Sequence, residues 1–213
     1  MLMKSKNNLL IAGAVTVAVQ SAHKADAQTV ETLLVQLKSP DENVSGPAWQ
    51  SAGPCGAKAV QGLGKLMADD DFEVARSAKR ALMNVVWYAG RPRAEKEARA
   101  VQKELIQLLK EKQPVVRKCA VWMLSEIGNE KAVPSMATLL TEKETREDAR
   151  CAILRMPREA ALYALRRALK TVPDDFKYAL ADSLRTLGEP VAGFTSTKLV
   201  PTAKTEVEMV KPR

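Results

Sequence analysis

Basic and aromatic side chains recur in one spacing in the middle of the chain. Arg76 and Arg80 are four residues apart, as are Lys118 and Trp122, and Arg150 occupies the equivalent position in the next segment. Residues four apart lie on the same side of an α-helix. If successive helices stack, we expect these five residues to form a cationic stripe that contains one indole, the basic stripe. Such a surface would suit carboxylates, phosphates or a peptide with an acidic or aromatic side chain.

The alternative interpretation is that these cations form an ordinary solvated helix face. Lys and Arg are good helix formers that remain hydrated, and the aliphatic stem of Lys118 can cover Trp122. The sequence leaves both interpretations open. The corresponding positions near the two ends of the chain are not basic, so any stripe is confined to the middle: Gly46, Gln50, Tyr178 and Asp182.

We predict no catalytic residue, no metal site and no cofactor. The only histidine, His23, lies in an N-terminal segment that we expect to be removed. Histidine is the usual general base at neutral pH and the commonest metal ligand. A Ser-His or Cys-His pair and a histidine-containing zinc site are therefore excluded from the mature chain. Acidic runs at residues 69–71 and 174–175 each precede a phenylalanine, and helix capping accounts for them.

The chain has three cysteines, Cys55, Cys119 and Cys151, without metal or redox spacing. Cys119 and Cys151 occupy matching positions in successive segments. Equivalent points on stacked helices are about 8 to 10 Å apart, whereas a disulfide needs Cα atoms within about 7 Å. We expect small buried apolar side chains, and whether Cys119 and Cys151 pair is left open.

A recurring apolar pattern predicts the elements that position these residues. A set of four mainly apolar positions, i, i+3, i+6 and i+7, occurs five times along the chain. Each set is followed by a polar break rich in Asp, Ser, Thr and Pro. Hydrophobic residues make up 46% and aromatic residues only 4% of the chain, which favours an all-α protein with closely packed helices. The last points of the sets, which recur at steps of 30, 42, 31 and 29 residues, are Leu37, Met67, Leu109, Leu140 and Leu169. This period predicts an α-solenoid of about five helical hairpins.

One stretch carries a resemblance to a known family. Val116 and Arg117, followed by Ala120, Leu124 and the pair Ile127–Gly128, resemble a HEAT repeat of the short kind found in phycobilisome-lyase-like proteins. The resemblance implies that the second helices line a concave face and that this face binds partners. We expect a solenoid over residues 28–189, with repeats at about 29–55, 56–87, 98–128, 129–157 and 158–189.

Two segments interrupt or follow this array. An insertion is expected at 88–97, where Gly-Arg-Pro breaks the preceding helix, and Trp87 and Tyr88 beside it are expected to pack. Residues 190–213 contain Pro, Thr, Lys and Val without helical period, and we expect a flexible C-terminal tail. Gly46 and Pro47 should weaken the second helix of the first repeat.

The N-terminus has the features of a cleavable signal peptide over residues 1–27. Lys4 and Lys6 precede an apolar run at residues 9–19, and residues 25–27 match a small-x-small cleavage site. The run would span roughly 16 Å as a helix, about half of a bilayer core, which is too short for an anchor. We therefore expect a bacterial periplasmic or secreted protein with no stable membrane anchor after cleavage.

The leading functional hypothesis is an exported, non-enzymatic scaffold that uses its concave face to bind a protein or peptide. An acidic partner is one option. Nucleic-acid binding is an alternative, because the net charge is +8 and the pI about 9.4, but export argues against it. A tetrapyrrole lyase or chaperone is implied by the resemblance alone. The identity of the partner and the oligomeric state cannot be predicted from the sequence.

Overall fold

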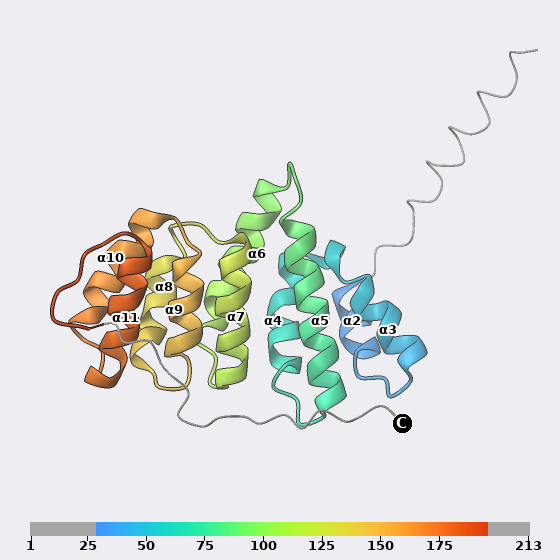
Figure 1. Ribbon diagram of the computed structural model, residues 1–213. Coiled ribbons are helices and arrows are strands. Elements are labelled where there is room, and N and C mark those ends of the chain that lie inside the picture. The colour runs from blue at the N-terminus through green and yellow to red at the C-terminus, as the bar shows by residue number, and fades with distance from the viewer. Residues whose placement is uncertain (1–28, 196–213) are drawn as a thin grey trace, which may run out of the picture.

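Five pairs of antiparallel helices make up the part of the chain that the computed structural model describes, residues 29–195 (Figure 1). No strand occurs among these residues. A short 3₁₀ helix, η2 (Gly53–Cys55), follows the first pair, and another, η3 (Thr138–Thr141), extends α8. The pairs are α2 (Val30–Gln36) with α3 (Glu42–Gln50), α4 (Ala57–Leu66) with α5 (Phe72–Ala89), α6 (Glu95–Leu108) with α7 (Pro114–Ile127), α8 (Val133–Ala137) with α9 (Arg146–Leu154), and α10 (Arg158–Leu169) with α11 (Asp174–Thr186).

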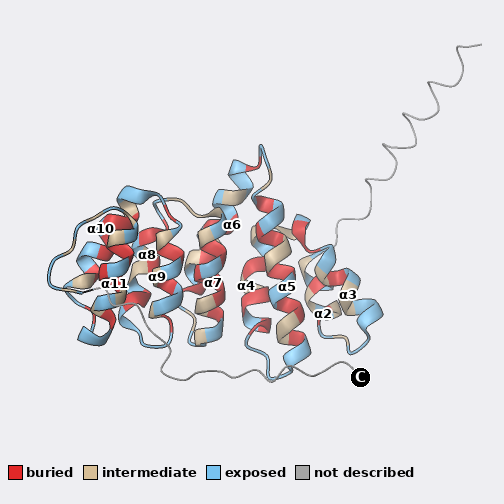
Figure 2. Cartoon of the chain, in the orientation of Figure 1, coloured by how far each residue is buried: buried red, intermediate tan, exposed pale blue. Residues whose placement is uncertain are grey.

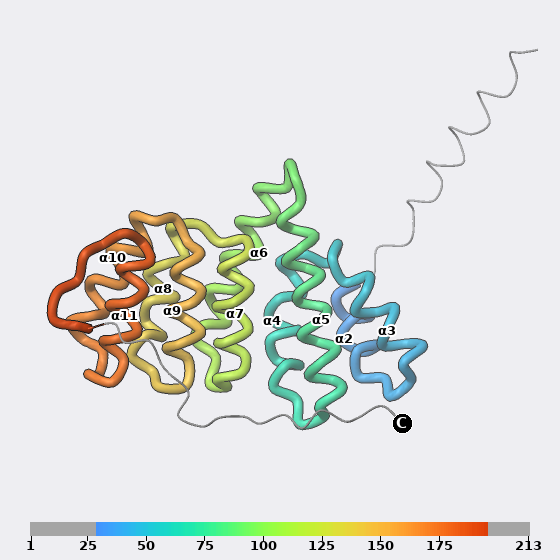
Figure 3. Tube along the Cα trace, in the orientation of Figure 1, coloured from blue at the N-terminus to red at the C-terminus, as the bar shows by residue number. Residues whose placement is uncertain are grey.

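The helices form two layers in a linear array (Figures 1 and 3). The first helix of each pair belongs to one layer, in which α2 contacts α4, α4 contacts α6, and α8 contacts α10. The second helices form the other layer, in which α3, α5, α7, α9 and α11 contact one another in that order. We call these the first-helix layer and the second-helix layer. The predicted all-α solenoid of about five hairpins is confirmed.

The core lies between the layers, as the predicted apolar pattern requires (Figure 2). Of the five pattern ends, only Leu169 is partly exposed, and the others are buried. The small inward residues of the second helices are buried as well: Ala48, Ala78, Ala120, Ala152 and, in the last repeat, Leu180. Small side chains at these points let the two layers approach closely, which is why so few aromatic residues suffice for the core.

Helix capping is confirmed at the first acidic run. The Asp71 carboxylate accepts hydrogen bonds from the backbone N–H of Glu73 at 2.8 Å and of Val74 at 3.3 Å. These bonds satisfy two of the amides that have no partner at the start of a helix. They fix the first residue of α5, and with it the direction in which the side chains of α5 point.

The second acidic run lies at the start of its helix, as predicted, but it does not form a side-chain cap. The N-cap of α11 is Pro173, and Asp174 and Asp175 lie in the first turn. Asp175 instead forms an ion pair with Arg146 on the preceding second helix, at 2.6 Å. The hydrogen bond from Arg146 lowers the pKa of Asp175. This acid therefore joins two repeats.

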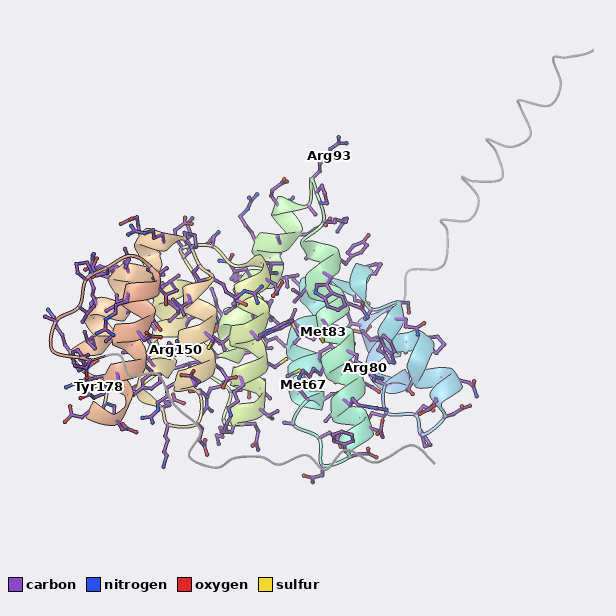
Figure 4. All side chains as sticks on the ribbon, viewed as in Figure 1. Met67, Arg80, Met83, Arg93, Arg150 and Tyr178 are labelled. Atoms are coloured by element: carbon purple, nitrogen blue, oxygen red, sulfur yellow. The ribbon has the colours of Figure 1, made fainter. Side chains whose placement is uncertain are left out.

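Half of the expected insertion at 88–97 belongs to the flanking helices. Helix α5 continues to Ala89 and α6 begins at Glu95, so only residues 90–94 form a turn, with Arg93 at a positive φ of 67° (Figure 4). Trp87 is 53% exposed, and the expectation that it packs is wrong. At the other weak point, α3 is nine residues long and contains Pro47.

The two ends of the chain, residues 1–28 and 196–213, lie outside the described residues, and with them the expected signal peptide and most of the expected tail. Residues 190–195 are described, and they lie against α11. Arg185 donates hydrogen bonds to the carbonyl oxygens of Val191 and Phe194, and the rings of Phe194 and Tyr178 meet edge to face at 5.4 Å. The first residues of the tail expected from residue 190 therefore contact the last helix. Between residues 29 and 195, no helix has both the length and the apolar character to cross a membrane.

Candidate binding groove on the second-helix layer

A groove of about 720 Å³ runs between α5 and α7, and we call it the α5/α7 groove. Met67, after the end of α4, and Asp148, on α9, complete its lining. The residues from its two main walls are Phe72, Ala75, Arg76, Lys79 and Met83 on α5, and Val115, Lys118, Cys119 and Trp122 on α7. Three residues of the predicted basic stripe, Arg76, Lys118 and Trp122, are thus brought together.

Helical spacing explains how these walls form. On α5, positions 72, 76, 79 and 83 are four, three and four residues apart, and on α7 positions 115, 118 and 122 are three and four apart. Side chains at such intervals form one stripe along a helix. The start of α5 is fixed by its Asp71 cap, and α7 begins with Pro114, a residue suited to the first turn. The two stripes therefore face each other.

Large apolar side chains are exposed along the groove. Phe72 is 72% exposed, Val115 54% and Trp122 41%. Met67 and Met83, labelled in Figure 4, add flexible thioether chains to the lining. Three exposed apolar residues that line one groove together with charged residues are typical of an interaction site rather than of an ordinary solvated face.

The cations of the groove are weakly paired. Arg76 forms an ion pair with Glu73 one turn earlier, and the Nζ of Lys118 lies 3.9 Å from the Asp148 Oδ2, with both side chains more than 40% exposed. Lys79 forms no ion pair with any residue between 29 and 195. Exposed pairs of this kind contribute about 0.2 to 1 kcal/mol. A carboxylate of a ligand can therefore replace Asp148 or meet Lys79 at little cost.

Arg80 lies on the other flank of α5. Its guanidinium stacks on the ring of Trp49, 5.2 Å from the ring centroid, and it lines a smaller hollow of about 350 Å³ between α3 and α5. That hollow also contains the carboxylates of Glu42, Asp71 and Glu73, so its charge is mixed. The structure therefore separates Arg80 from the groove, although Arg76 borders both cavities.

Arg150 joins two repeats and does not line the groove. It forms an ion pair with Glu147 on its own helix and donates a hydrogen bond of 2.7 Å to the Ser183 Oγ on α11. Its side chain is mostly buried, and Figure 4 places it in the other half of the array from Met67 and Met83. The hydrogen bond from Arg150 lowers the pKa of Glu147. These contacts are those of a structural cation.

The cysteines differ from one another. Cys119 lies at the bottom of the groove and is buried, and this burial raises the pKa of its thiol to about 11. Cys151 is exposed, which contradicts the expectation of a buried apolar side chain, and it forms no disulfide with Cys119. Among residues 29–195, no group of three or more His, Cys, Asp and Glu side chains is placed to hold a metal ion.

The sequence prediction named Arg76, Lys118 and Trp122 but none of the other groove residues, among them Phe72, Lys79, Met83 and Val115. It placed the binding surface two positions before and two positions after the central alanine of each second helix. A groove between two helices is instead lined by the facing sides of both helices. The side of α5 that faces α7 carries Lys79, one residue after Ala78, and the side of α7 that faces α5 carries Cys119, one residue before Ala120. The spacing of Phe72, Lys79 and Met83 in the sequence places them on one side of a helix. The sequence does not show which neighbouring helix that side faces.

A comparison with protein-family models agrees with the repeat architecture. A family model of HEAT repeats matches residues 84–156, from the end of α5 through α9. No curated protein matches the chain.

Among solved structures, an engineered protein (target OR329) is 22% identical, with 83% of this chain and 84% of that chain covered and a TM-score of 0.39. The designed armadillo repeat protein YIII(Dq)4CqI is 21% identical over 81% and 85% of the two chains, with a TM-score of 0.39. Another designed armadillo repeat protein, in complex with the peptide (KR)4, is 20% identical over 75% and 87%, with a TM-score of 0.37.

Proposed function

We propose that this protein is a non-enzymatic scaffold that binds a segment of a protein or peptide partner in the α5/α7 groove. The observation that carries the proposal is the juxtaposition of three exposed apolar side chains, Phe72, Val115 and Trp122, with Lys79, which forms no ion pair within residues 29–195. Interfaces gain most of their affinity from a few such anchors, among which tryptophan is enriched. Burying these residues removes apolar surface from water, which the free protein cannot do.

The partner segment should combine apolar and acidic side chains. The groove falls within the range of about 300 to 1,000 Å³ that is typical of ligand pockets, so it holds a few side chains and not a whole domain face. Arg76, Lys79 and Lys118 surround the apolar walls, whereas Asp148 is the only acid in the lining. A carboxylate near Lys79 and Lys118 would gain charge-assisted hydrogen bonds.

The nucleic-acid alternative is less well supported. The groove brings together only three cations, Arg76, Lys79 and Lys118, among apolar walls, and the other two basic residues of the predicted stripe lie outside it. Phosphate binding needs several unpaired cations along one track. The tetrapyrrole alternative and the likeness to phycobilisome-lyase-like proteins rest on the sequence resemblance alone.

We also propose that the protein is exported from a bacterial cytoplasm and carries no stable membrane anchor after cleavage, on the basis of residues 1–27. Fusion of these residues to a reporter without a signal of its own tests the proposal. Periplasmic reporter cleaved after Ala27 is the expected result, and an uncleaved cytoplasmic fusion would contradict export.

The test of the groove is a charge reversal measured with a defined probe. The probe is a fluorescein-labelled peptide, Glu-Phe-Glu-Leu-Glu-Leu, titrated with the full chain and followed by fluorescence anisotropy. The double variant Lys79→Glu/Lys118→Glu should bind at least about tenfold more weakly, or about 1.4 kcal/mol, because it places like charges opposite the peptide.

A matched control carries the same change of charge outside the groove. Lys96 and Lys103 lie on α6 and are exposed, and the variant Lys96→Glu/Lys103→Glu should bind the probe like the wild type. Equal affinities for all three proteins, with unchanged melting temperatures, would remove the groove as the binding site.

A further inference from the structure

We propose that residues 205–210 of this same chain dock in the α5/α7 groove, so that the protein carries an internal competitor for its partner. The inference rests on the proposed function, because it assigns the same groove, and it adds a regulatory occupant to it. Residue 195 is the last described residue, so this segment lies outside the structure, and the argument comes from its sequence, its tether and the surface that would receive it.

The segment has the composition that the groove favours. Residues 205–210 read Thr-Glu-Val-Glu-Met-Val, with two acids, three apolar residues and no base. In an extended chain, successive side chains point to opposite sides. Glu206 and Glu208 would then share one side, and Val207 and Met209 the other.

The receiving surface has the complementary arrangement. Lys79 and Lys118 face each other across the groove from α5 and α7. The apolar residues Phe72, Val115 and Trp122 are exposed along the same walls. One side of the extended segment would therefore meet cations while the other covers apolar surface.

The tether is long enough and starts on the correct layer. The ring contact between Phe194 and Tyr178 holds the chain on α11, in the second-helix layer and near the N-terminal end of that helix. Val115 and Lys118 lie near the N-terminal end of α7, and successive second helices run in the same direction. The path from α11 past α9 to the groove crosses two to three helix spacings of about 8 to 10 Å each. Residues 195–206 reach about 36 Å when extended.

Tethering makes a weak contact sufficient. A segment joined to its site by a short flexible linker has an effective concentration in the millimolar range. The docked tail would therefore compete with a partner even if the free peptide had only modest affinity. To displace the tail, a partner would have to bind the groove more favourably than the tethered residues 205–210 do.

Photo-crosslinking in the full chain tests the inference. Met209 is replaced by p-benzoylphenylalanine, the protein is irradiated at low concentration, and crosslinked residues are mapped by mass spectrometry. The expected crosslinks join residue 209 to residues 67–83 and 115–122 of the same chain. The variant Glu206→Lys/Glu208→Lys should lower the yield at least about fivefold, and combining it with Lys79→Glu/Lys118→Glu should restore it because the charges are exchanged.

Control variants and alternative outcomes decide the result. Reversal of two other charges on the tail, Lys198→Glu/Lys211→Glu, should leave the yield at least as high as in the wild type. Crosslinks between two chains that increase with concentration, or crosslinks spread over other faces, would overturn the inference.

Affinity for the labelled peptide separates this inference from the proposed function. If the tail competes, Glu206→Lys/Glu208→Lys should bind the Glu-Phe-Glu-Leu-Glu-Leu probe several-fold more tightly than the wild type. Tight binding of the probe that depends on Lys79 and Lys118 but is unaffected by these tail changes would leave the groove in place and remove the tail as its occupant. Loss of probe binding in every variant would remove the proposed function itself.

Discussion

At the scale of single residues, equivalent positions in successive repeats do different work. Arg76, Lys118 and Arg150 have matching places in their helices, but Arg150 is held by Glu147 and Ser183 while Lys118 has only a distant acid. The difference comes from the neighbouring helix. Ser183 on α11 accepts a hydrogen bond from Arg150, whereas Lys118 faces an open groove.

Removal of Arg150 should change the titration of Glu147. The pKa of Glu147 lies below its ordinary value of 4.5, chiefly because Arg150 donates hydrogen bonds to the carboxylate. Its contribution to stability is therefore present above the unfolded-state pKa and is lost as the pH falls through the lower folded-state value. In Arg150→Gln, the pKa should rise toward 4.5, and unfolding by acid should begin at a higher pH.

Carbon-detected NMR of the Glu147 carboxyl, with circular dichroism across an acid titration, measures both effects. Lys143→Gln removes an exposed cation of the same region that does not contribute to this pKa, and it should leave Glu147 unchanged. A Glu147 titration that is the same in the wild type and Arg150→Gln would contradict the structural role of this pair.

At the scale of helices, two glycines differ in how closely a neighbouring helix packs against them. A Cβ added to Gly64 on α4 would lie 2.5 Å from the Leu108 Cδ2 on α6, and Leu108 is fully buried, whereas a Cβ on Gly46 of α3 would meet nothing within 4 Å. Gly46→Ala gains helix propensity, but the following Pro47 disfavours a helical residue with a Cβ before it, so the free energy of unfolding should change by less than about 1 kcal/mol. Gly64→Ala should lower it by about 1 kcal/mol or more, because overpacking outweighs the gain in propensity. Urea unfolding compares the two, and stabilisation by both changes would refute the close contact of α4 with α6.

The elements themselves were largely predictable, and the site was predictable only in part. Apolar residues three and four apart must be buried together, so their repetition was enough to predict helix pairs and a linear array. The surface depends on which flank of one helix faces the next, and that depends on the position of each helix relative to its neighbours. For this reason Arg76, Lys118 and Trp122 were found, Arg80 and Arg150 lie elsewhere, and Lys79 was missed.

At the scale of the whole molecule, the array offers a long layer of second helices with one groove in its middle. The longest second helix, α5, forms one wall of this groove and includes the first two residues of the insertion expected at 88–97. The ends of the layer are less suited to binding. The first repeat has a short α3, and α11 is covered in part by residues 191–194.

The most direct test of the account uses the methionine methyl groups as reporters of the bound position. Met67 and Met83 line the α5/α7 groove, while Met136 and Met156 are buried in other repeats. With methyl-labelled methionine in the full chain, addition of the Glu-Phe-Glu-Leu-Glu-Leu peptide should shift the signals of Met67 and Met83 and leave those of Met136 and Met156 in place. Shifts confined to Met136 and Met156, or no shift at a peptide concentration that saturates the anisotropy signal, would contradict binding in the groove.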